Sequence, residues 1–193
     1  MTFSTGISPQ QTPSTNFIFV NRSSPRDEFT FDLAQVKASY FIGFGVKYDL
    51  HPFFLAADAQ YTKREYVYNI SYTYPGFGRS EEIEQKSESM NVINVPMTLG
   101  VDLGIVDVTS GFLPQFIISH ATELSDLDGY NEDLNWLRLG WHTGVAAHVG
   151  AMRMGISMQM DFNNYADHAY VRNQSLSLQS RPTRLFGSFG YQF

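Results

Sequence analysis

The sequence predicts an all-β fold, an eight-stranded antiparallel up-and-down transmembrane β-barrel made by a single domain over residues 1–193. First, apolar and polar residues alternate with a period of two over eight segments. Second, many of these segments exceed the roughly 5 or 6 residues of an ordinary strand and match the about 9 to 11 residues of a tilted membrane strand. Third, the connections alternate between short and long, as in outer-membrane barrels.

The first half of the chain supplies four strands. A weak alternation covers residues 3–8, and the clearest one covers 36–50, where each even position from Val36 to Tyr48 is apolar. Two more follow over 53–62 and 93–104. The second face of these strands holds mostly Gly, Ser, Thr and Asn with single charges, unlike the dense Lys and Glu coat of a soluble exterior. We therefore expect the apolar face to meet lipid and the polar face to line the barrel.

The second half supplies the other four strands, over 106–119, 137–149, 152–163 and 184–193. The last strand ends in alternating aromatic residues, Phe189, Tyr191 and Phe193. A final strand that closes on an aromatic residue is similar to the signal read by the bacterial β-barrel assembly machinery. We expect these three residues to act as such an assembly signal.

The connections set the orientation. Short turns are expected at about 49–52, 103–106 and 149–152, and long loops at about 9–34, 64–88, 121–134 and 164–182. In outer-membrane barrels the short turns are periplasmic and the long loops extracellular. The sequence therefore predicts a location in the bacterial outer membrane with both termini periplasmic, surrounded by lipid and lipopolysaccharide.

Composition excludes several classes of protein. The net charge of -6 argues against a nucleic-acid partner, which requires a basic face. The absence of cysteine removes disulfides, thiolate catalysis and zinc–thiolate sites. Because no apolar run reaches about 18 residues, a transmembrane helix is also excluded.

Eight strands leave an interior that side chains fill. The inward positions carry six basic and five acidic residues, and an unpaired charge in that space would be costly. We therefore expect a salt-bridged plug and not an open channel. His142 and His148 lie six residues and about 20 Å apart along one strand, so they cannot share a metal and are expected to be hydrogen-bonded interior residues. The expected lumen network comprises Lys37, Lys47, Asp49, Asp58, Arg64, Asp102, Asp107, Arg138, His142, His148, Arg153, Asp161 and Arg184.

No catalytic constellation is found. Ser119 and His120, near Glu123 and Asp126, point to opposite faces of their strand. Lipid A deacylases of comparable barrel type carry a His and a Ser two residues apart, a pattern that this chain lacks. A second set, Asp167 and His168 with Ser175, places the His and Ser seven residues apart in a loop. We expect no enzymatic activity, catalytic residue, cofactor or metal; a lipid A-modifying enzyme and a narrow channel remain lesser alternatives.

Two connections have distinctive compositions. The loop over 123–133 has five acids and no base, but it does not fit a calcium-loop frame, so a solvated loop or weak divalent binding are the alternatives. In the second connection, Tyr66, Tyr68, Tyr72 and Tyr74 continue the alternation, so the strands on either side could project beyond the membrane as a hairpin. These tyrosines are either a partner-contact ridge or packed against neighbouring loops.

A resemblance agrees with this fold. The stretch Asn94–Pro96 followed by Gly100–Gly104, and the ending Arg184–Phe193, resemble the small outer-membrane β-barrel proteins of Bacteroidota, the PorT-like barrel group. The resemblance implies an envelope barrel whose relatives are often accessory subunits of secretion or uptake complexes. PorT itself belongs to the type IX secretion system. No catalytic residues follow from this resemblance.

The expected function is therefore that of a non-enzymatic structural or accessory subunit of a larger outer-membrane complex for protein secretion, assembly or uptake. Its contacts with other outer-membrane proteins would use small wall residues, Ala57, Ala59, Ala147 and Gly187, and the adaptable methionines Met154 and Met158. Ordinary lipid contact is the alternative for any one of these residues. A stand-alone barrel that binds surfaces or adheres through its extracellular loops is the main rival.

Overall fold

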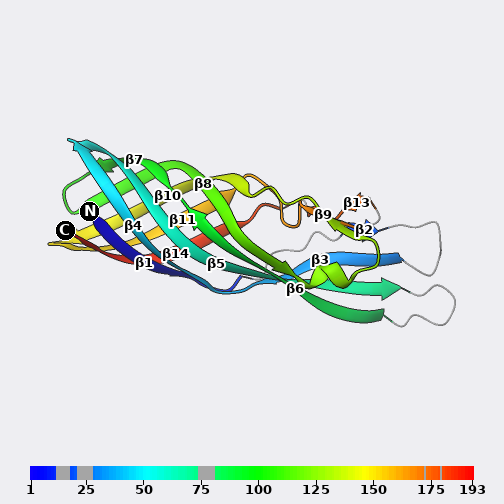
Figure 1. Cartoon of the computed structure of the whole chain (residues 1–193). Coiled ribbons are helices and arrows are strands. Elements are labelled where there is room, and N and C mark those ends of the chain that lie inside the picture. Colours follow the sequence, from blue (N-terminus) through cyan, green and yellow to red (C-terminus); the bar gives the residue numbers. More distant parts are fainter. Residues whose placement is uncertain (12–17, 21–27, 74–80, 172, 179) are drawn as a thin grey trace.

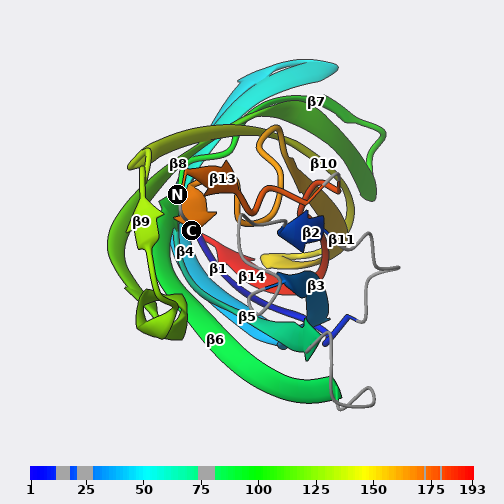
Figure 2. The same ribbon diagram turned by 90° about the vertical axis from the view of Figure 1, so that its right-hand side faces the viewer.

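The computed structural model describes residues 1–193 except 12–17, 21–27, 74–80, 172 and 179, and it leaves out the side chains of 18–20, 28–29, 72–73 and 81–83. Within this part of the chain, eight antiparallel wall strands close into a barrel, which confirms the predicted fold class and strand number (Figures 1 and 2). The wall elements are β1 (Thr2–Ser8), β4 (Ser39–Leu50), β5 (Phe53–Thr73), β6 (Glu81–Asn94), β7 (Met97–Asp102), β8 (Val106–Thr122), β10 (Leu137–Val149), β11 (Met152–Asp161) and β14 (Thr183–Gln192).

Elements β6 and β7 together form one wall strand that is broken at Val95 and Pro96. Both pair with β5 on one side and with β8 on the other. Proline has no N–H to donate, so a strand is normally interrupted there. The ladder nevertheless continues, because the Val95 N–H donates to the Pro114 carbonyl at 2.8 Å and the Pro96 carbonyl accepts from the Asp58 N–H at 3.1 Å.

Three tight turns and both termini lie at one end of the barrel, which we call the short-turn end (Figure 1). Strand β1 pairs with both β4 and β14, so the first and last strands of the chain close the wall. The Phe193 N–H donates to the Met1 carbonyl at 2.9 Å, which keeps the two termini side by side. The expected positions of the short turns are therefore confirmed.

At the opposite end, β5 and β6 continue as a hairpin well beyond the rest of the wall (Figure 1). Their pairing runs from Gln60 and Asn94 to Thr73 and Glu81. The expected loop over 64–88 is therefore too long, and the projecting hairpin is confirmed. The loop expected over 9–34 is too long as well, because β3 (Glu28–Val36) adds to β5 on the side of this hairpin and carries β2 (Ile18–Val20) at its edge.

Short elements cover this outer end. A 3-10 helix, η1 (Glu123–Asp126), follows β8, and a small sheet is formed by β9 (Tyr130–Glu132), β12 (Ala169–Val171) and β13 (Gln174–Ser175). Figure 2, which looks onto this end, shows β13 and the orange segment beside it lying within the ring of wall strands. No helix in the described ranges is long and apolar enough to cross a membrane.

The two faces of the wall have opposite polarity, as the alternation predicts. On β4, the outward Ile42, Phe44 and Val46 are 45%, 60% and 57% exposed, whereas the inward Phe41 is 3% exposed. The same apolar exterior continues around β5, β7, β8, β10, β11 and β14. Beyond Tyr61 on β5 the outward residues become polar, at Lys63 and Glu65, and this change marks the outer edge of an apolar band.

The alternation changes phase at Lys37, so the lumen position predicted for this residue is wrong. Lys37 and Ala38 are both exposed between the buried residues Val36 and Ser39, which means that one extra residue separates β3 from β4. The Lys37 ammonium is thereby placed on the exterior, where it pairs with the Glu65 carboxylate.

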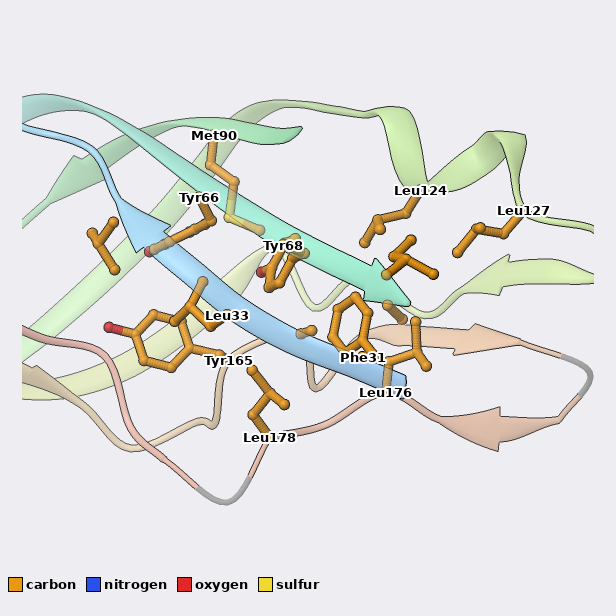
Figure 3. Packing of buried hydrophobic residues seen from close by; sticks show 14 of the residues in the cluster. Phe31, Leu33, Tyr66, Tyr68, Met90, Leu124, Leu127, Tyr165, Leu176 and Leu178 are labelled. Atoms are coloured by element: carbon orange, nitrogen blue, oxygen red, sulfur yellow. The ribbon is translucent and has the colours of Figure 1, made fainter. Parts of the chain in front are cut away.

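The hydrophobic core lies in the outer half of the molecule and not at the centre of the barrel. Side chains from β3, β5, β6, β8, η1 and the connection before β14 pack together there (Figure 3). Phe31 stacks on Tyr68 with 4.8 Å between ring centroids, and Tyr66 meets Tyr165 edge to face at 5.5 Å. The outer connections and the strand segments that pack against them therefore form one packed unit, which we call the outer module.

At two glycines of the wall, an added side chain is predicted to have different effects on the stability of the barrel. A Cβ on the inward Gly111 would lie 2.1 Å from the Met97 carbonyl oxygen, whereas a Cβ on the outward Gly187 would meet nothing within 4 Å. Gly111→Ala should destabilise the barrel by about 1–3 kcal/mol because the clash involves backbone atoms, and Gly187→Ala should leave stability unchanged. Heat-dependent gel mobility of the folded barrel measures both effects, and equal melting of the two variants would contradict this packing.

Candidate functional site

The barrel interior is closed at the outer end of β11 and β14 by a buried carboxylate between two guanidinium groups. Asp161 on β11 accepts from Arg184 Nη2 on β14 at 2.6 Å and from Arg64 Nη1 on β5 at 3.2 Å. All three side chains are at most 3% exposed. Charges buried this deeply are tolerated only when they are paired and hydrogen-bonded.

Neutral side chains form further hydrogen bonds with the Asp161 carboxylate and with the two guanidinium groups. Arg64 also donates to Gln115 Oε1 at 2.6 Å and to Asn94 Oδ1 at 2.8 Å, and Gln115 in turn donates to Asp161. Arg184 donates to the Tyr66 hydroxyl at 3.1 Å. The network therefore links β5, β6, β8, β11 and β14 across the lumen, and we call it the central network.

A second charged group lies toward the short-turn end. Asp107, which is 1% exposed, is 2.5 Å from His148 Nε2 and 3.9 Å from both Lys47 and Arg153. Lys47 also pairs with Asp49 at 3.2 Å. In the described interior, one pocket of about 60 Å³ lies beside Gln60 and His142, and one of about 10 Å³ lies around the Asp107 group. These volumes have room for a few water molecules and not for a conduction path.

The other residues of the predicted network are placed as follows. Asp102 lies 3.9 Å from Lys47 at the short-turn rim. Asp58 and His142 line the pocket of about 60 Å³, and His142 Nδ1 is buried without a hydrogen-bond partner. Arg138 is buried nearer the outer end, where it pairs with Asp167 at 2.9 Å. Apart from Lys37, all the predicted network residues therefore lie in the barrel interior or at its rims.

A third polar cluster, which the sequence did not reveal, lies inside the outer module. Glu88 on β6 directs one carboxylate oxygen, Oε1, at two imidazoles: His120 Nε2 on β8 at 2.8 Å and His168 Nε2 at 2.6 Å. Its other oxygen accepts from the Tyr68 hydroxyl at 2.7 Å. These side chains are at most 4% exposed. The ligand atoms of Glu88, His120 and His168 lie within 4.8 Å of one another, so this set could hold a metal ion.

The far nitrogen of each imidazole faces a further carboxylate. His120 Nδ1 is 3.3 Å from Glu132, and His168 Nδ1 is 3.5 Å from Asp167. Arg138 Nη2 lies 3.1 Å from the same His168 nitrogen and also holds Asp167. Each histidine is thus enclosed between two carboxylates.

This cluster, which we call the Glu88 cluster, lies beyond the apolar band. The neighbouring outward positions are polar, at Glu65, Ser87 and Ser89. Burial would raise the pKa of Glu88, but the close contacts of its carboxylate with His120 and His168 outweigh burial and lower this pKa to about 2. Burial would lower the pKa of His168, yet close contacts with Asp167 and Glu88 raise it to about 9. Without a metal, a charged Glu88–His168 pair is therefore present at neutral pH.

The predicted aromatic contact ridge is wrong where the structure describes it. Tyr66 is 4% and Tyr68 0% exposed, because β3 and the connection before β14 cover this face of the hairpin. The alternative, packing against neighbouring segments, is therefore the one observed. The side chain of Tyr72 and all of Tyr74 lie outside the described residues.

The candidate catalytic sets are not assembled. Ser119 is exposed and accepts a hydrogen bond from Asn91, whereas His120 points inward, so the predicted opposite orientations are confirmed. Ser175 is exposed and its hydroxyl accepts from the Ser177 N–H, away from His168.

The carboxylates of the acidic loop contact protein groups. Glu123 accepts from the Ser87 N–H at 2.7 Å, and Asp126 pairs with Lys86 at 3.1 Å. Glu132 is oriented toward His120 and the Tyr130 hydroxyl. These three carboxylates contact different groups and do not converge, which argues against divalent binding by this loop and favours the solvated-loop alternative.

The exterior of the wall carries two apolar grooves. One, of about 820 Å³, lies around Gly187 between Ile7, Tyr40, Ala147, Met154 and Phe189. The other, of about 880 Å³, lies on the wall formed by β4, β5, β7, β8 and β10 and contains Ala57. Met154 and Met158 are 62% and 39% exposed on this exterior, and the small residue Ala59 is also exposed.

Comparison with known proteins finds no matching family, no similar curated protein and no similar solved structure. The resemblance to the PorT-like group therefore stays a prediction.

Removing the charge of Asp161 should destabilise the barrel strongly. Asp161→Asn leaves Arg64 and Arg184 buried without their counter-charge, at a cost of about 3–5 kcal/mol. Asp49→Asn is the matched control, because the Asp49 side chain is 66% exposed and should contribute less than about 1 kcal/mol. Thermal unfolding followed by gel mobility or circular dichroism compares them. Similar melting temperatures for both variants would contradict the central network.

The metal-free outer module should be most stable between about pH 4.5 and 6.5. Above pH 6.5 the raised pKa of His168 makes its contribution fall until about pH 9. Below pH 4.5 the contribution of Glu88 to stability, which arises from its lowered pKa, falls until about pH 2, because the carboxylate becomes protonated. The His168 contribution is on the order of 3 kcal/mol. Hydrogen-exchange protection factors of β6 and β8, measured with a chelator present, should decrease from pH 6.5 to 9, and His168→Gln should remove this decrease. An unchanged pH profile in His168→Gln would contradict the assignment.

Proposed function

We propose that this chain is an integral outer-membrane barrel with both termini in the periplasm. The support is the continuous belt of exposed apolar side chains around the wall, which includes Phe44, Val46, Leu99, Phe112 and Ile156. Soluble monomers rarely expose an apolar surface of such extent, whereas lipid covers it at no cost. The short turns and both termini share one end, which matches the periplasmic side of known outer-membrane barrels.

We infer that the protein serves as a non-enzymatic structural or accessory subunit of a larger outer-membrane complex for secretion, assembly or uptake. The lumen is filled by paired charges, so transport through this barrel is disfavoured. Neither candidate serine comes together with its histidine, since Ser119 accepts from Asn91 and Ser175 from the Ser177 N–H, so the structure offers no support for nucleophilic chemistry at those positions. Contacts made by the wall or by the outer module are then the remaining means of action.

The observation that carries this proposal is the groove around Gly187. Gly187 leaves a depression between the larger residues Ile7, Tyr40 and Phe189, and Ala147 widens it. Small residues permit the backbone of another membrane protein to approach closely. Met154 lies at the same groove and can adapt its shape to the side chains of a partner. We therefore assign the groove to a bulky apolar side chain on the wall of another outer-membrane protein.

The remaining partners follow from the location. Lipid and lipopolysaccharide would surround the rest of the wall. Phe189 and Tyr191 on β14 and Phe193 directly after it are 46%, 43% and 78% exposed, and β14 is the strand that closes the barrel against β1. This arrangement supports their proposed role as the signal for the β-barrel assembly machinery.

The packing of the outer module favours a second candidate function, surface binding or adhesion. Leu124, Leu176 and Leu178 are at most 1% exposed, so the outer connections form a defined surface above the barrel. A binding protein would act through this surface and would not need the wall groove.

Filling the groove separates the two functions. Gly187→Phe adds a large side chain where nothing lies within 4 Å of the Cβ position, so the barrel itself should fold normally. We expect this variant to lose the large complex that wild-type protein forms after extraction in mild detergent. Ala59→Phe is the control, because Ala59 is outward and exposed but lies outside both grooves. Native gels and mass spectrometry of the extracted species provide the measurement.

A complex that survives Gly187→Phe unchanged would refute the groove as the contact. If the wild-type protein itself migrates as a lone barrel, the subunit proposal fails and binding through the outer module becomes the leading function.

A further inference from the structure

We propose that Glu88, His120 and His168 bind one divalent first-row transition-metal ion, with Zn²⁺ as the best match, inside the outer module. This proposal is independent of the subunit role, because it concerns a site within one chain and does not require a partner.

The geometry of the three side chains is close to that of a metal site. Both Nε2 atoms approach the same carboxylate oxygen, at 2.8 and 2.6 Å, and all three ligand atoms lie within 4.8 Å of one another. Zinc bonds of about 2.0–2.2 Å place neighbouring tetrahedral ligand atoms roughly 3.3 Å apart. To admit the ion, the two imidazoles would have to move away from Glu88 by about half an ångström and toward each other, by up to about 1.5 Å from a separation of at most 4.8 Å.

The surrounding groups match those that orient metal ligands. In protein metal sites, the second ring nitrogen of a ligating histidine usually donates to a carboxylate or carbonyl. Here His120 Nδ1 faces Glu132 at 3.3 Å and His168 Nδ1 faces Asp167 at 3.5 Å. The Tyr68 hydroxyl fixes the second oxygen of Glu88. Glu88 and His120 thus each have an orienting partner, whereas His168 Nδ1 lies between Asp167 at 3.5 Å and the closer Arg138 Nη2 at 3.1 Å.

An independent observation concerns the nitrogen of His168 that faces the site. His168 is 2% exposed, and its Nε2 has no hydrogen-bond partner of acceptable geometry, although Glu88 Oε1 is only 2.6 Å away. A buried polar atom without a well-aligned partner is costly. A metal ion bound to the Nε2 lone pair would remove this cost.

The chemistry of the donors selects the metal. Two imidazoles and one carboxylate suit Zn²⁺ and its first-row neighbours, whereas Ca²⁺ and Mg²⁺ prefer oxygen ligands throughout. Three protein ligands leave the fourth position of a tetrahedral ion to a water molecule. Because the three side chains are buried, the ion would nevertheless be shielded from bulk solvent. It would link β6 and β8 to the connection between β11 and β12, and so hold that connection inside the barrel mouth.

The test uses the full chain, folded in detergent and stripped with a chelator that is then removed. Zn²⁺ alone is titrated by calorimetry, and Co²⁺ alone is titrated by visible absorption, which reports the coordination geometry. We expect one ion per chain. Glu88→Gln and His168→Gln should weaken binding by more than about 100-fold, and Asp167→Asn by about 10–100-fold. His51→Gln and His142→Gln are the controls, since both residues lie outside the Glu88 cluster, and they should bind like the wild type.

Heat-dependent gel mobility shows whether each variant is folded, and His120→Gln replaces any ligand variant that is not. Zn²⁺ should also slow proteolysis in the connection over 164–182 in the wild type and in both controls, but not in the ligand variants. One-to-one binding that persists in folded ligand variants would overturn the proposal. So would Zn²⁺ binding to the wild type that is no tighter than binding to these variants.

Discussion

The pairing of Asp161 with Arg64 and Arg184 is the interaction on which the rest of the structure depends. A narrow barrel cannot hydrate three buried charges, so each must find its counter-charge on another strand, and this requirement fixes β5, β11 and β14 relative to one another. Gln115 and Asn94 extend the constraint to β8 and β6. The same pairing fills the lumen. The interior side chains thereby hold the wall strands together. Contacts with other molecules are then made by the exterior of the wall and by the outer module.

The outer module shows how the barrel is extended without opening it. Strands β5 and β6 continue past the apolar band, and their inward face changes from charged residues to a packed hydrophobic cluster. Within that cluster the carboxylate of Glu88 is again matched by basic partners, now two histidines, because the same cost of buried charge applies. The molecule thus has three polar centres along its length, and each connects strands that are distant in sequence.

Alternation along the chain was sufficient to predict the eight wall strands, the short turns and most inward charges, since a period of two assigns each residue to a face without any knowledge of its partners. It failed where the phase changes. Lys37, which the alternation places in the lumen, lies on the exterior because one extra residue separates β3 from β4. Glu88 could have been recognised from its phase with the inward Met90 and Val92, but a register shift opposite β8 and the return of His168 from a remote connection are not visible in local sequence. For the same reason, the burial of Tyr66 and Tyr68 was not predictable: alternation shows which side chains share a face, and not which segment covers that face.

The central claim is that paired charges seal this barrel, and electrical recording in planar lipid bilayers tests it most directly. Folded wild-type protein, verified by its heat-dependent gel mobility, should insert and produce no sustained single-channel current, because paired charges fill the lumen and the pockets found among the described interior residues measure about 60 and 10 Å³. Stable, reproducible conductance steps from the folded protein would show a continuous water path through the lumen and would contradict this account.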